Sequence, residues 1–311
     1  MALNVAITGS TGFIGQTLVS RLRQEGHTVT RFLRPGPRRV FNEQTADWDP
    51  EQGMIDVRSL ENQDIVIHLS GASIAGHRWT PSYKRAILDS RVNGTQLLSK
   101  TIARLAKPPK VLLSASAVGF YGPHPPDRAV DESAPRGRGV LADVCAAWES
   151  ATAAARIAGI RVVNMRIGMV LGPSGGALAK MLPPFWWGLG GPLGNGRQMM
   201  SWIALDDIPS AVMHLIRTDS LEGPVNLVSP KPVSNREFTK ILARVIRRPA
   251  VLPVPPLAIK ALFGQMGEEL LLSGAAIYPR RLMDTGYEFH FPDVTAALKS
   301  AMETSSVSQF R

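Results

Sequence analysis

Three glycines that follow the first apolar run of the chain constrain its fold more than any other feature. The run LNVAIT (residues 3–8) predicts a buried strand, TGSTGFIG (8–15) follows it, and residues 13–25 have the spacing of an amphipathic helix. Glycines at such a turn allow close approach to a pyrophosphate, which the amides at the helix N-terminus bind. Packing alone is the alternative explanation, but the position between strand and helix favours a dinucleotide site.

Arginines at the end of the second predicted strand (27–33) indicate which dinucleotide binds. The segment RFLRPGPRR (31–39) contains Arg31, Arg34, Arg38 and Arg39, and the first acid after it is Glu43. In dinucleotide folds, an acid at this place selects a free ribose 2′-hydroxyl, whereas arginine accommodates a 2′-phosphate. The arginines therefore favour NADP(H) over NAD(H), with a solvated surface turn as the alternative interpretation.

Strands and helices alternate through the first two-thirds of the chain. Strands are predicted at 3–8, 27–33, 64–70, 110–116, 161–166 and 224–229, and helices at 13–25, 81–106, 141–158 and 206–218. This order predicts an α/β fold, a Rossmann-like doubly wound parallel sheet with right-handed crossovers. Further helices at 235–247 and 255–278 predict a smaller, mostly helical C-terminal substrate domain. We expect an NADP(H)-binding domain of residues 1–172 plus 205–229, a substrate-side domain of 173–204 plus 230–303, and a frayed tail of 304–311.

A segment dense in glycine, proline and aromatic residues, 173–203, follows the fifth predicted strand. It leaves the sheet at the edge where ligands bind in open α/β folds. Two roles fit its aromatic side chains equally, stacking on a planar or sugar-like ligand and packing the small domain on the large one. These side chains are Phe185, Trp186, Trp187 and Trp202. Asn195 and Arg197 are candidate contacts for an anionic substrate.

Composition excludes several other classes of protein. The net charge of +10 arises from scattered Lys and Arg, and no zinc-finger or RNA-binding signature accompanies it, so we expect no nucleic acid partner. The single cysteine, Cys145, excludes an intrachain disulfide, and the six histidines lack metal-ligand spacing, so no metal site is expected. We find no signal peptide, and proline and glycine interrupt the apolar stretches, so we expect a cytoplasmic protein without a membrane partner.

The motifs resemble those of the extended short-chain dehydrogenase/reductase superfamily, in particular its nucleotide-sugar epimerase-like members. The resemblance rests on TGSTGFIG, HLSGA (68–72), VNGT (92–95), SASAVGFYG (114–122) and RIGMVLGP (166–173). The stretches 71–91 and LADVCAAWE (141–149) are similar to an atypical epimerase-like branch with an extra C-terminal helical domain. We expect the cofactor to contact Thr8, Gly9, Thr11, Gly12, Phe13, Ile14, Gly15, Arg31, Leu33, Arg34, Leu69, Ser70, Gly71, Arg91 and Val170.

The acid/base residues of the superfamily are matched only in part. Active members carry a Tyr-x-x-x-Lys pair, a Ser and an Asn. Ser116 matches the Ser, but counting back from Glu149 puts Leu141 and Cys145 at the Tyr and Lys positions, and Arg91 takes the Asn position. Leu donates no proton, and Cys supplies no fixed positive charge. We therefore expect Ser116 and Tyr121 as the catalytic residues. Tyr83 and His77 are weaker candidates, and a packing role is the alternative for Tyr121.

The sequence thus predicts an NADP(H)-dependent, epimerase-like oxidoreductase that acts on a small-molecule carbonyl or hydroxyl compound, with a nucleotide sugar implied by the resemblance. The alternative is a non-catalytic protein that binds or senses NADPH, and the unmatched Tyr-Lys pair motivates it. The resemblance also implies a homodimer.

Overall fold

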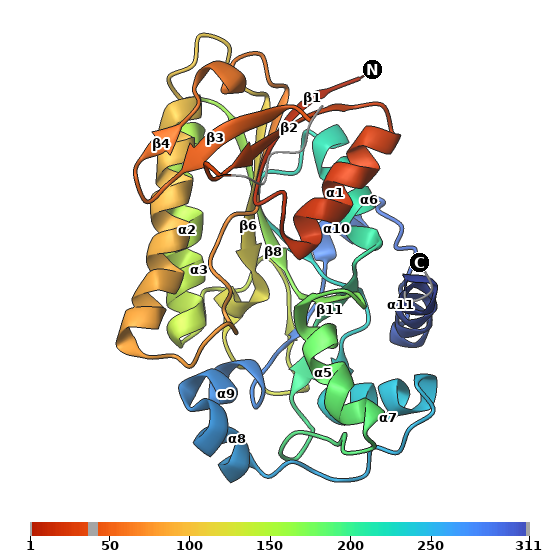
Figure 1. Cartoon of the computed structure of the whole chain (residues 1–311). Helices are drawn as coiled ribbons and strands as arrows, with labels where there is room; N and C mark the ends of the chain where they lie inside the picture. Colours follow the sequence, from red (N-terminus) through yellow and green to blue (C-terminus); the bar gives the residue numbers. More distant parts are fainter. Residues whose placement is uncertain (1, 37–42, 309–311) are drawn as a thin grey trace. The chain divides into compact units, whose positions relative to one another are not determined.

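The computed structural model describes residues 2–36 and 43–308 (Figure 1). An eight-stranded sheet has the order β12-β8-β6-β5-β1-β2-β3-β4, and its central pairs, β2–β1, β1–β5 and β5–β6, are parallel. Only the short β4 pairs antiparallel with its neighbour β3 among the registers given for this sheet. The strands are β1 (Asn4–Thr8), β2 (Thr28–Leu33), β3 (Thr45–Asp49), β4 (Met54–Ile55), β5 (Ile65–His68), β6 (Val111–Ala117), β8 (Arg161–Ile167) and β12 (Gly223–Leu227).

Helices lie on both sides of this sheet, as predicted for a doubly wound fold. Figure 1 shows α1 on one side of the strands and α2 on the other. Thr80 caps α2 by accepting a hydrogen bond from the Tyr83 amide at 3.2 Å, and Pro81 occupies the first turn. The elements are α1 (Phe13–Gln24), η1 (Arg58–Leu60), α2 (Pro81–Ile102), α3 (Val140–Ser150), α4 (Ala153–Ile157) and α6 (Asp207–Arg217). The helix predicted at 141–158 is thus two helices, because the backbone leaves helical hydrogen bonding near Ala151 and Thr152.

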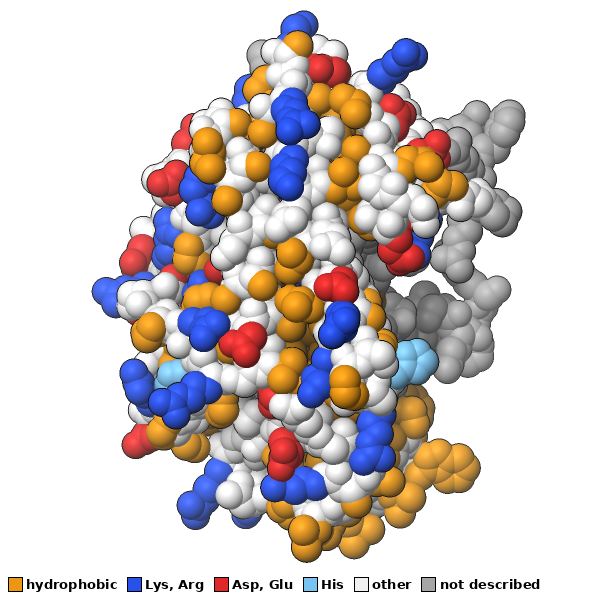
Figure 2. All heavy atoms as spheres, turned by 90° about the vertical axis from the view of Figure 1, so that its left-hand side faces the viewer, with side chains coloured by type: hydrophobic (Ala, Val, Ile, Leu, Met, Phe, Trp, Pro, Cys, Tyr) orange, Lys and Arg blue, Asp and Glu red, His pale blue; other side chains and the backbone are white. Residues whose placement is uncertain are grey.

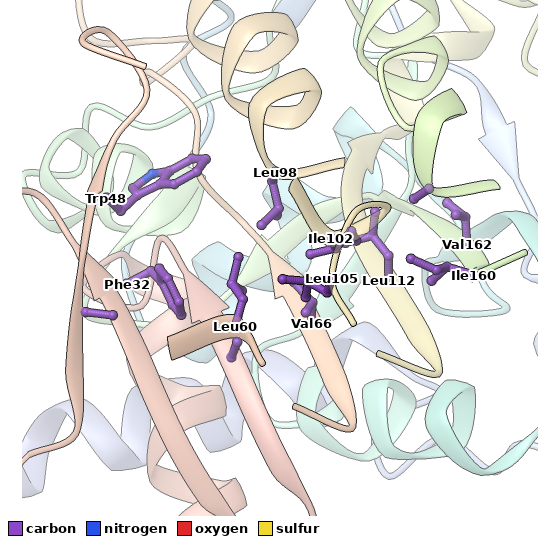
Figure 3. Close-up of a cluster of buried hydrophobic side chains, with 13 residues drawn as sticks. Phe32, Trp48, Leu60, Val66, Leu98, Ile102, Leu105, Leu112, Ile160 and Val162 are labelled. Atoms are coloured by element: carbon purple, nitrogen blue, oxygen red, sulfur yellow. The ribbon is translucent and has the colours of Figure 1, made fainter. Parts of the chain in front are cut away.

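An apolar cluster fills the space between the sheet and α2 (Figure 3). Phe32 and Leu112 come from strands, Leu98 and Ile102 come from α2, and Trp48 comes from β3, next to the edge strand β4. All five side chains are at most 3% exposed. Burying such side chains stabilises a fold by roughly 1.5–3 kcal/mol each, so this cluster fixes how α2 lies on the strands and where the strand ends meet.

The described chain forms two compact units. The first holds the residues up to Ala117 together with Val144–Arg166 and Pro209–Val225, and the second holds Val118–Asp143, Ile167–Ile208 and the residues from Asn226 onward. The second unit therefore includes 118–143, which the sequence analysis placed in the NADP(H)-binding part. Pairing explains the difference, since β7 (Ala129–Val130) lies parallel to β14 (Ala276–Ile277).

The second unit is mostly helical with short strand pairs, as expected for the C-terminal part. Its core gathers Phe185, Trp202, Phe238 and Leu298. Its remaining elements are η2 (Val118–Tyr121), β9 (Met169–Leu171), α5 (Gly176–Trp186), β10 (Met199–Met200), β11 (Trp202–Ala204), β13 (Val233–Ser234), α7 (Asn235–Val245), α8 (Pro256–Phe263), α9 (Gln265–Leu270), α10 (Arg280–Asp284) and α11 (Val294–Ser308).

One helix predicted for the C-terminal part was wrong in detail. The helix expected at 255–278 is divided into α8 and α9 at Gly264, which has φ +57°, a left-handed conformation that a helix does not continue through. It also ends at Leu270, and Ala276–Ile277 form the strand β14 instead. The helix α11 reaches Ser308, so it includes the first residues of the predicted frayed tail. Within the described ranges, none of the helices combines the length and the apolar character needed to cross a bilayer.

Candidate functional site

The glycine turn between β1 and α1 leaves no space for side chains at two of its three glycines. A Cβ on Gly15 would lie 2.3 Å from the carbonyl oxygen of Gly9, and a Cβ on Gly9 would lie 2.7 Å from the backbone of Leu69. Gly9 also has φ +69°. At Gly12 the space is tighter than usual, with 3.3 Å to the Gly9 oxygen. The turn therefore packs directly on the residues after β5, which brings the predicted cofactor residues Leu69 and Ser70 to Gly9.

The N-terminus of α1 has the features of an anion site. Gly12 caps the helix without a side-chain hydrogen bond, and the first turn contains no acid. Thr11 and Gly12 are exposed, while Phe13 and Ile14 are partly buried. Amides at such a terminus carry a partial positive charge, so this stretch suits the pyrophosphate of a dinucleotide.

His68, at the end of β5, joins three elements beneath the turn. Its Nδ1 lies 2.7 Å from the Thr8 hydroxyl, and its Nε2 lies 3.0 Å from the Thr95 hydroxyl on α2. Complete burial lowers the pKa of His68 to about 4, so the ring is neutral at physiological pH. Thr8, predicted as a cofactor contact, therefore uses its side chain within the protein. The HLSGA motif marked this histidine, but its contacts were not foreseen.

Arg31 reaches from β2 to the glycine turn. Its Nε donates to the Ser10 hydroxyl at 3.2 Å, and its Nη1 forms an ion pair with Glu43. Glu43 also pairs with Arg23 at 2.7 Å, and the Arg23 hydrogen bond, followed by Arg31, lowers the pKa of this carboxyl. Arg31 thus lies beside the turn, as a ligand for a 2′-phosphate must, and Glu43 holds it there.

The other residues predicted around the ribose differ in their settings. Arg34 is 61% exposed and pairs with Glu51 at 2.5 Å, whereas Leu33 is buried in the sheet. Arg38 and Arg39 lie outside the described residues. Of the predicted arginines that the structure describes at this strand, Arg31 is therefore the better placed.

Arg91 on α2 lies against the predicted cofactor residue Gly71. A Cβ on Gly71 would be 3.2 Å from the Arg91 Cζ. The guanidinium also stacks on the Trp148 ring, 4.9 Å from its centroid, and donates to the Ile87 carbonyl at 3.1 Å. Burial lowers the pKa of Arg91 from its ordinary value. The guanidinium is thus held in place by an aromatic ring and a backbone carbonyl.

Ser116, predicted as a catalytic residue, belongs to a buried polar network at the end of β6. Its hydroxyl donates to Glu149 Oε1 at 2.7 Å. Arg166 on β8 binds both oxygens of the same carboxylate, at 2.8 and 2.9 Å. Ser116 and Arg166 are each 3% exposed. Because an ionised carboxylate only accepts hydrogen bonds, the Ser116 proton points to Glu149, and the lone pairs of its oxygen remain for another donor.

The positions matched to the Tyr and Lys of the superfamily are apolar in character. Cys145 is 3% exposed, and burial raises the pKa of its thiol to about 11, so the thiol is protonated and neutral. The Leu141 amide donates to Glu269 Oε2 at 3.1 Å, and the Val140 amide donates to the other oxygen at 3.2 Å. Glu269, which the sequence analysis did not single out, thus caps the first turn of α3.

Tyr121, the second catalytic residue predicted from the sequence, is fully buried in the second unit. Its hydroxyl donates to Asn226 Oδ1 at 2.7 Å, and the ring packs among Val130, Val228 and Ile277. This geometry favours the packing alternative stated for Tyr121. Val170, predicted to touch the cofactor, is also buried, in the β9–β11 pair opposite Ile203.

The weaker candidates pair with each other in the first unit. The rings of His77 and Tyr83 make an edge-to-face contact with centroids 5.1 Å apart, and the Tyr83 hydroxyl donates to the Ser73 carbonyl. Both residues lie on the segment that leads into α2 and on its first turn.

The aromatic residues of the segment 173–203 separate into two kinds. Phe185 and Trp202 are buried in the core of the second unit, and the Trp202 indole donates to the Lys231 carbonyl at 3.0 Å. Trp186 and Trp187 are exposed. Asn195 accepts from the amide of Arg197 at 2.9 Å, which stabilises a local turn. Among the residues that the structure describes, no cluster of three His, Cys, Asp or Glu side chains could hold a metal ion.

Comparisons with known families cover almost the whole chain. The model of the NAD dependent epimerase/dehydratase family matches residues 5–248, and a domain of unknown function (DUF1731) matches residues 254–301. Epimerase family protein Mb2239 of Mycobacterium bovis is 43% identical over 294 residues, which are 94% of this chain and 96% of that protein. Epimerase family protein SDR39U1 of Homo sapiens is 35% identical over 96% of this chain and 99% of its own.

Solved structures of epimerase family proteins are also similar to this chain. The crystal structure of human epimerase family protein SDR39U1 (isoform 2) with NADPH superposes with a TM-score of 0.86 at 33% identity, over 97% of this chain and 99% of that one. A nucleoside-diphosphate sugar epimerase from Corynebacterium glutamicum gives a TM-score of 0.79 at 33% identity, over 99% of this chain and 60% of that one. With the glycine turn and the parallel sheet, these matches show that the chain belongs to the NAD dependent epimerase/dehydratase family and carries the DUF1731 domain after it.

Proposed function

We propose that this protein is an NADP(H)-dependent, epimerase-like oxidoreductase of the extended short-chain type, which acts on a small-molecule carbonyl or hydroxyl compound. The observation that carries the proposal is the glycine turn, closed to side chains at Gly9 and Gly15, with the Arg31 guanidinium bonded to Ser10 beside it. The human relative solved with NADPH supports the choice of cofactor. A nucleotide sugar is the substrate class that the family resemblance suggests.

Several residues of the first unit would hold the cofactor. The turn from Thr11 to Ile14 would bind the pyrophosphate through backbone amides, and Arg31 would bind the 2′-phosphate. Leu69 to Gly71 line the adjoining end of β5, and Arg91 lies against Gly71 as a further cation for a phosphate. When bound, NADP(H) takes up or releases a hydride at its nicotinamide ring.

Ser116 would orient the substrate oxygen. Because its proton is committed to Glu149, the Ser116 oxygen can accept a hydrogen bond from a substrate hydroxyl. Glu149 and Arg166 then act as positioning residues, since they fix the direction of the Ser116 hydroxyl without reaching the substrate themselves. This arrangement suits the alcohol form of the substrate.

A second function, binding or sensing of NADPH without turnover, is favoured by one specific observation. At the position matched to the catalytic lysine stands Cys145, whose buried thiol is neutral and offers no positive charge to activate a proton donor. Tyr121 is bonded to Asn226 in the core of the other unit. The two functions share the cofactor site and differ only in whether substrate is converted.

Calorimetry with NADPH, followed by turnover assays, separates these functions. We expect NADPH to bind. We also expect either oxidation of NADPH by at least one carbonyl compound of a panel, or reduction of NADP⁺ by at least one hydroxyl compound or nucleotide sugar of that panel. Ser116→Ala should then lower turnover about 100-fold, the effect of losing a polar group that orients the reacting oxygen, and should leave NADPH affinity unchanged. Tight NADPH binding with no oxidation of NADPH, no reduction of NADP⁺ and no conversion of any nucleotide sugar in the panel would favour the sensing function. Absence of NADPH binding would overturn both functions. The cytoplasmic location and the homodimer stay predictions.

A further inference from the structure

The second unit exposes large apolar side chains to an unusual degree. Trp187 is 81% exposed, Leu257 is 80% exposed and Val251 is 75% exposed. Scattered apolar residues are normal on a surface, but a group of this size marks an interaction site. We call the group the apolar patch. It consists of Trp186, Trp187, Leu189, Val251, Leu252, Leu257, Leu262 and Phe263. Figure 2 shows hydrophobic side chains gathered at the lower end of the face where α8 and α9 lie.

Backbone contacts bring the two segments of the apolar patch together. The amide of Val254 donates to the Pro192 carbonyl at 3.0 Å, and its carbonyl accepts from the Gly194 amide at 2.9 Å. A Cβ on Gly188 would lie 3.5 Å from Pro249. The residues after α5 therefore lie alongside the residues before α8, which places Trp187 and Leu189 in the same region as Val251 and Leu252.

A group of cations adjoins the apolar patch. Lys240, Arg244, Arg247 and Arg248 are exposed and line an open depression of about 490 Å³, whose wall also includes the patch residue Val251. The sequence contains no Asp or Glu in residues 150–205 or in residues 238–267. Within the described ranges, none of these four cations forms an ion pair with an acid. The cations are therefore available to an anionic partner.

Arg247 adopts a conformation that arginine rarely does. It has φ +55°, at the position after the cap of α7, and the following Arg248 amide donates back to the Ala243 carbonyl at 3.0 Å. Glycine is preferred at such a helix end, because a Cβ is strained there. An arginine kept at a strained position suggests that its charge serves a purpose other than folding.

We propose that the apolar patch and its four cations dock this protein on the surface of a bilayer that contains anionic phospholipid. Tryptophan is favoured at the headgroup level of a bilayer, Leu and Val side chains enter the acyl boundary, and Lys and Arg bind anionic headgroups. No membrane partner was expected from the sequence, because proline and glycine interrupt its apolar stretches. Docking on a bilayer surface needs no spanning segment.

Charge argues against two other occupants of this surface. In a symmetric contact, this surface would meet the same surface of a second copy, and residues 238–267 offer no acid to pair with the four cations there. A nucleic acid would neutralise the arginines, but its phosphates would leave Val251, Leu252 and Leu257 without an apolar partner. An anionic bilayer offers acyl chains to the apolar patch and negative headgroups to the four cations.

Flotation with lipid vesicles tests the proposal. We expect the full chain to bind vesicles of phosphatidylcholine mixed with phosphatidylglycerol at least tenfold more tightly than vesicles of phosphatidylcholine alone, with affinity falling as salt rises. Trp187→Ser should weaken binding more than tenfold, because the variant lacks the exposed indole that would insert into the bilayer. Arg248→Gln should weaken it about fivefold, the effect of one cation at a membrane surface.

Arg247→Gly separates binding from folding. It removes a cation and relieves the left-handed conformation, so we expect about fivefold weaker vesicle binding together with an unchanged or higher melting temperature. Ile157→Ser and Arg156→Gln, exposed positions on α4 and outside the patch, serve as matched controls that should not change binding.

Three results would overturn the proposal. The first is equal binding to both kinds of vesicle, or none to either. The second is vesicle binding that Trp187→Ser and Arg248→Gln leave unchanged. The third is a concentration-dependent dimer, seen by analytical ultracentrifugation, that Trp187→Ser abolishes, because the patch would then be covered by a second copy.

Discussion

Arg166 binds the carboxylate of Glu149 with two hydrogen bonds, from Nε to Oε1 at 2.8 Å and from Nη2 to Oε2 at 2.9 Å. This bidentate pair is almost completely buried, and the same carboxylate accepts a hydrogen bond from Ser116, the residue that the sequence matches to the active-site serine of the superfamily. Glu149 therefore links the stability of the first unit to the orientation of a candidate catalytic group.

Glu149→Gln should destabilise the protein by about 3 kcal/mol, because it removes the negative charge that the buried Arg166 guanidinium binds with two hydrogen bonds. The glutamine oxygen can still accept one hydrogen bond, so the loss reflects mainly the charge. Urea denaturation at neutral pH measures it. Ser116→Ala is the matched variant, since it removes one neutral donor to the same carboxylate and should cost only about 1 kcal/mol. Equal losses in the two variants would show that the charge pair contributes little.

Gly15→Ala should abolish NADPH binding. The added Cβ would lie 2.3 Å from the Gly9 carbonyl oxygen, and because that atom belongs to the backbone of the turn, the turn itself must move. Calorimetry with NADPH gives the affinity, and circular dichroism checks that the fold persists. Gly26→Ala is the control. Gly26 has φ +81° with nothing within 4 Å of its Cβ position, so this variant should lose about 1 kcal/mol of stability and keep its cofactor affinity.

Arg31→Ala should weaken NADPH binding more than tenfold and change NADH binding less than twofold, because only NADPH carries the 2′-phosphate. Arg34→Asp should likewise weaken NADPH binding and spare NADH binding. Arg34→Ala should weaken NADPH binding less than Arg31→Ala does, because the Arg34 side chain is 61% exposed and paired with Glu51. Parallel titrations with both dinucleotides measure the preference. Equal losses for NADPH and NADH in the Arg31 variant would remove this residue from the 2′-phosphate site.

Local patterns were enough to predict much of the fold. The strands at β1, β2, β5, β6 and β8 and the helices α1 and α2 follow from apolar periodicity, caps and glycine turns, which act over a few residues. The short strand pairs β7–β14 and β9–β11 were missed, because each joins segments far apart in the chain and is only two or three residues long. Pairing of that kind depends on tertiary packing and leaves no periodic signal.

The candidate site shows the same division. The glycines, Arg31 and Ser116 were recognised because their residue types are tied to a motif. The partners Glu43 and Arg166 were not assigned, because an ion pair depends on which strands lie side by side. Tyr121 was a reasonable proton donor by sequence, but its hydroxyl turns to Asn226, which lies 105 residues further along the chain.

His68 should make the stability of the protein fall as the pH drops below its ordinary pKa. Burial lowers its pKa in the folded state to about 4, whereas in the unfolded chain it titrates near 6.5. The unfolded state therefore binds a proton first, so the stabilisation is complete above pH 6.5 and is lost progressively down to about pH 4. This difference corresponds to about 3 kcal/mol. Urea denaturation between pH 7 and pH 4.5 measures the slope, to which other titrating groups also contribute. The direct check is NMR of the His68 ring, which should show no protonation above pH 5.5. A His68 resonance that titrates near pH 6.5 in the folded protein would show that burial between Thr8 and Thr95 does not hold the ring neutral.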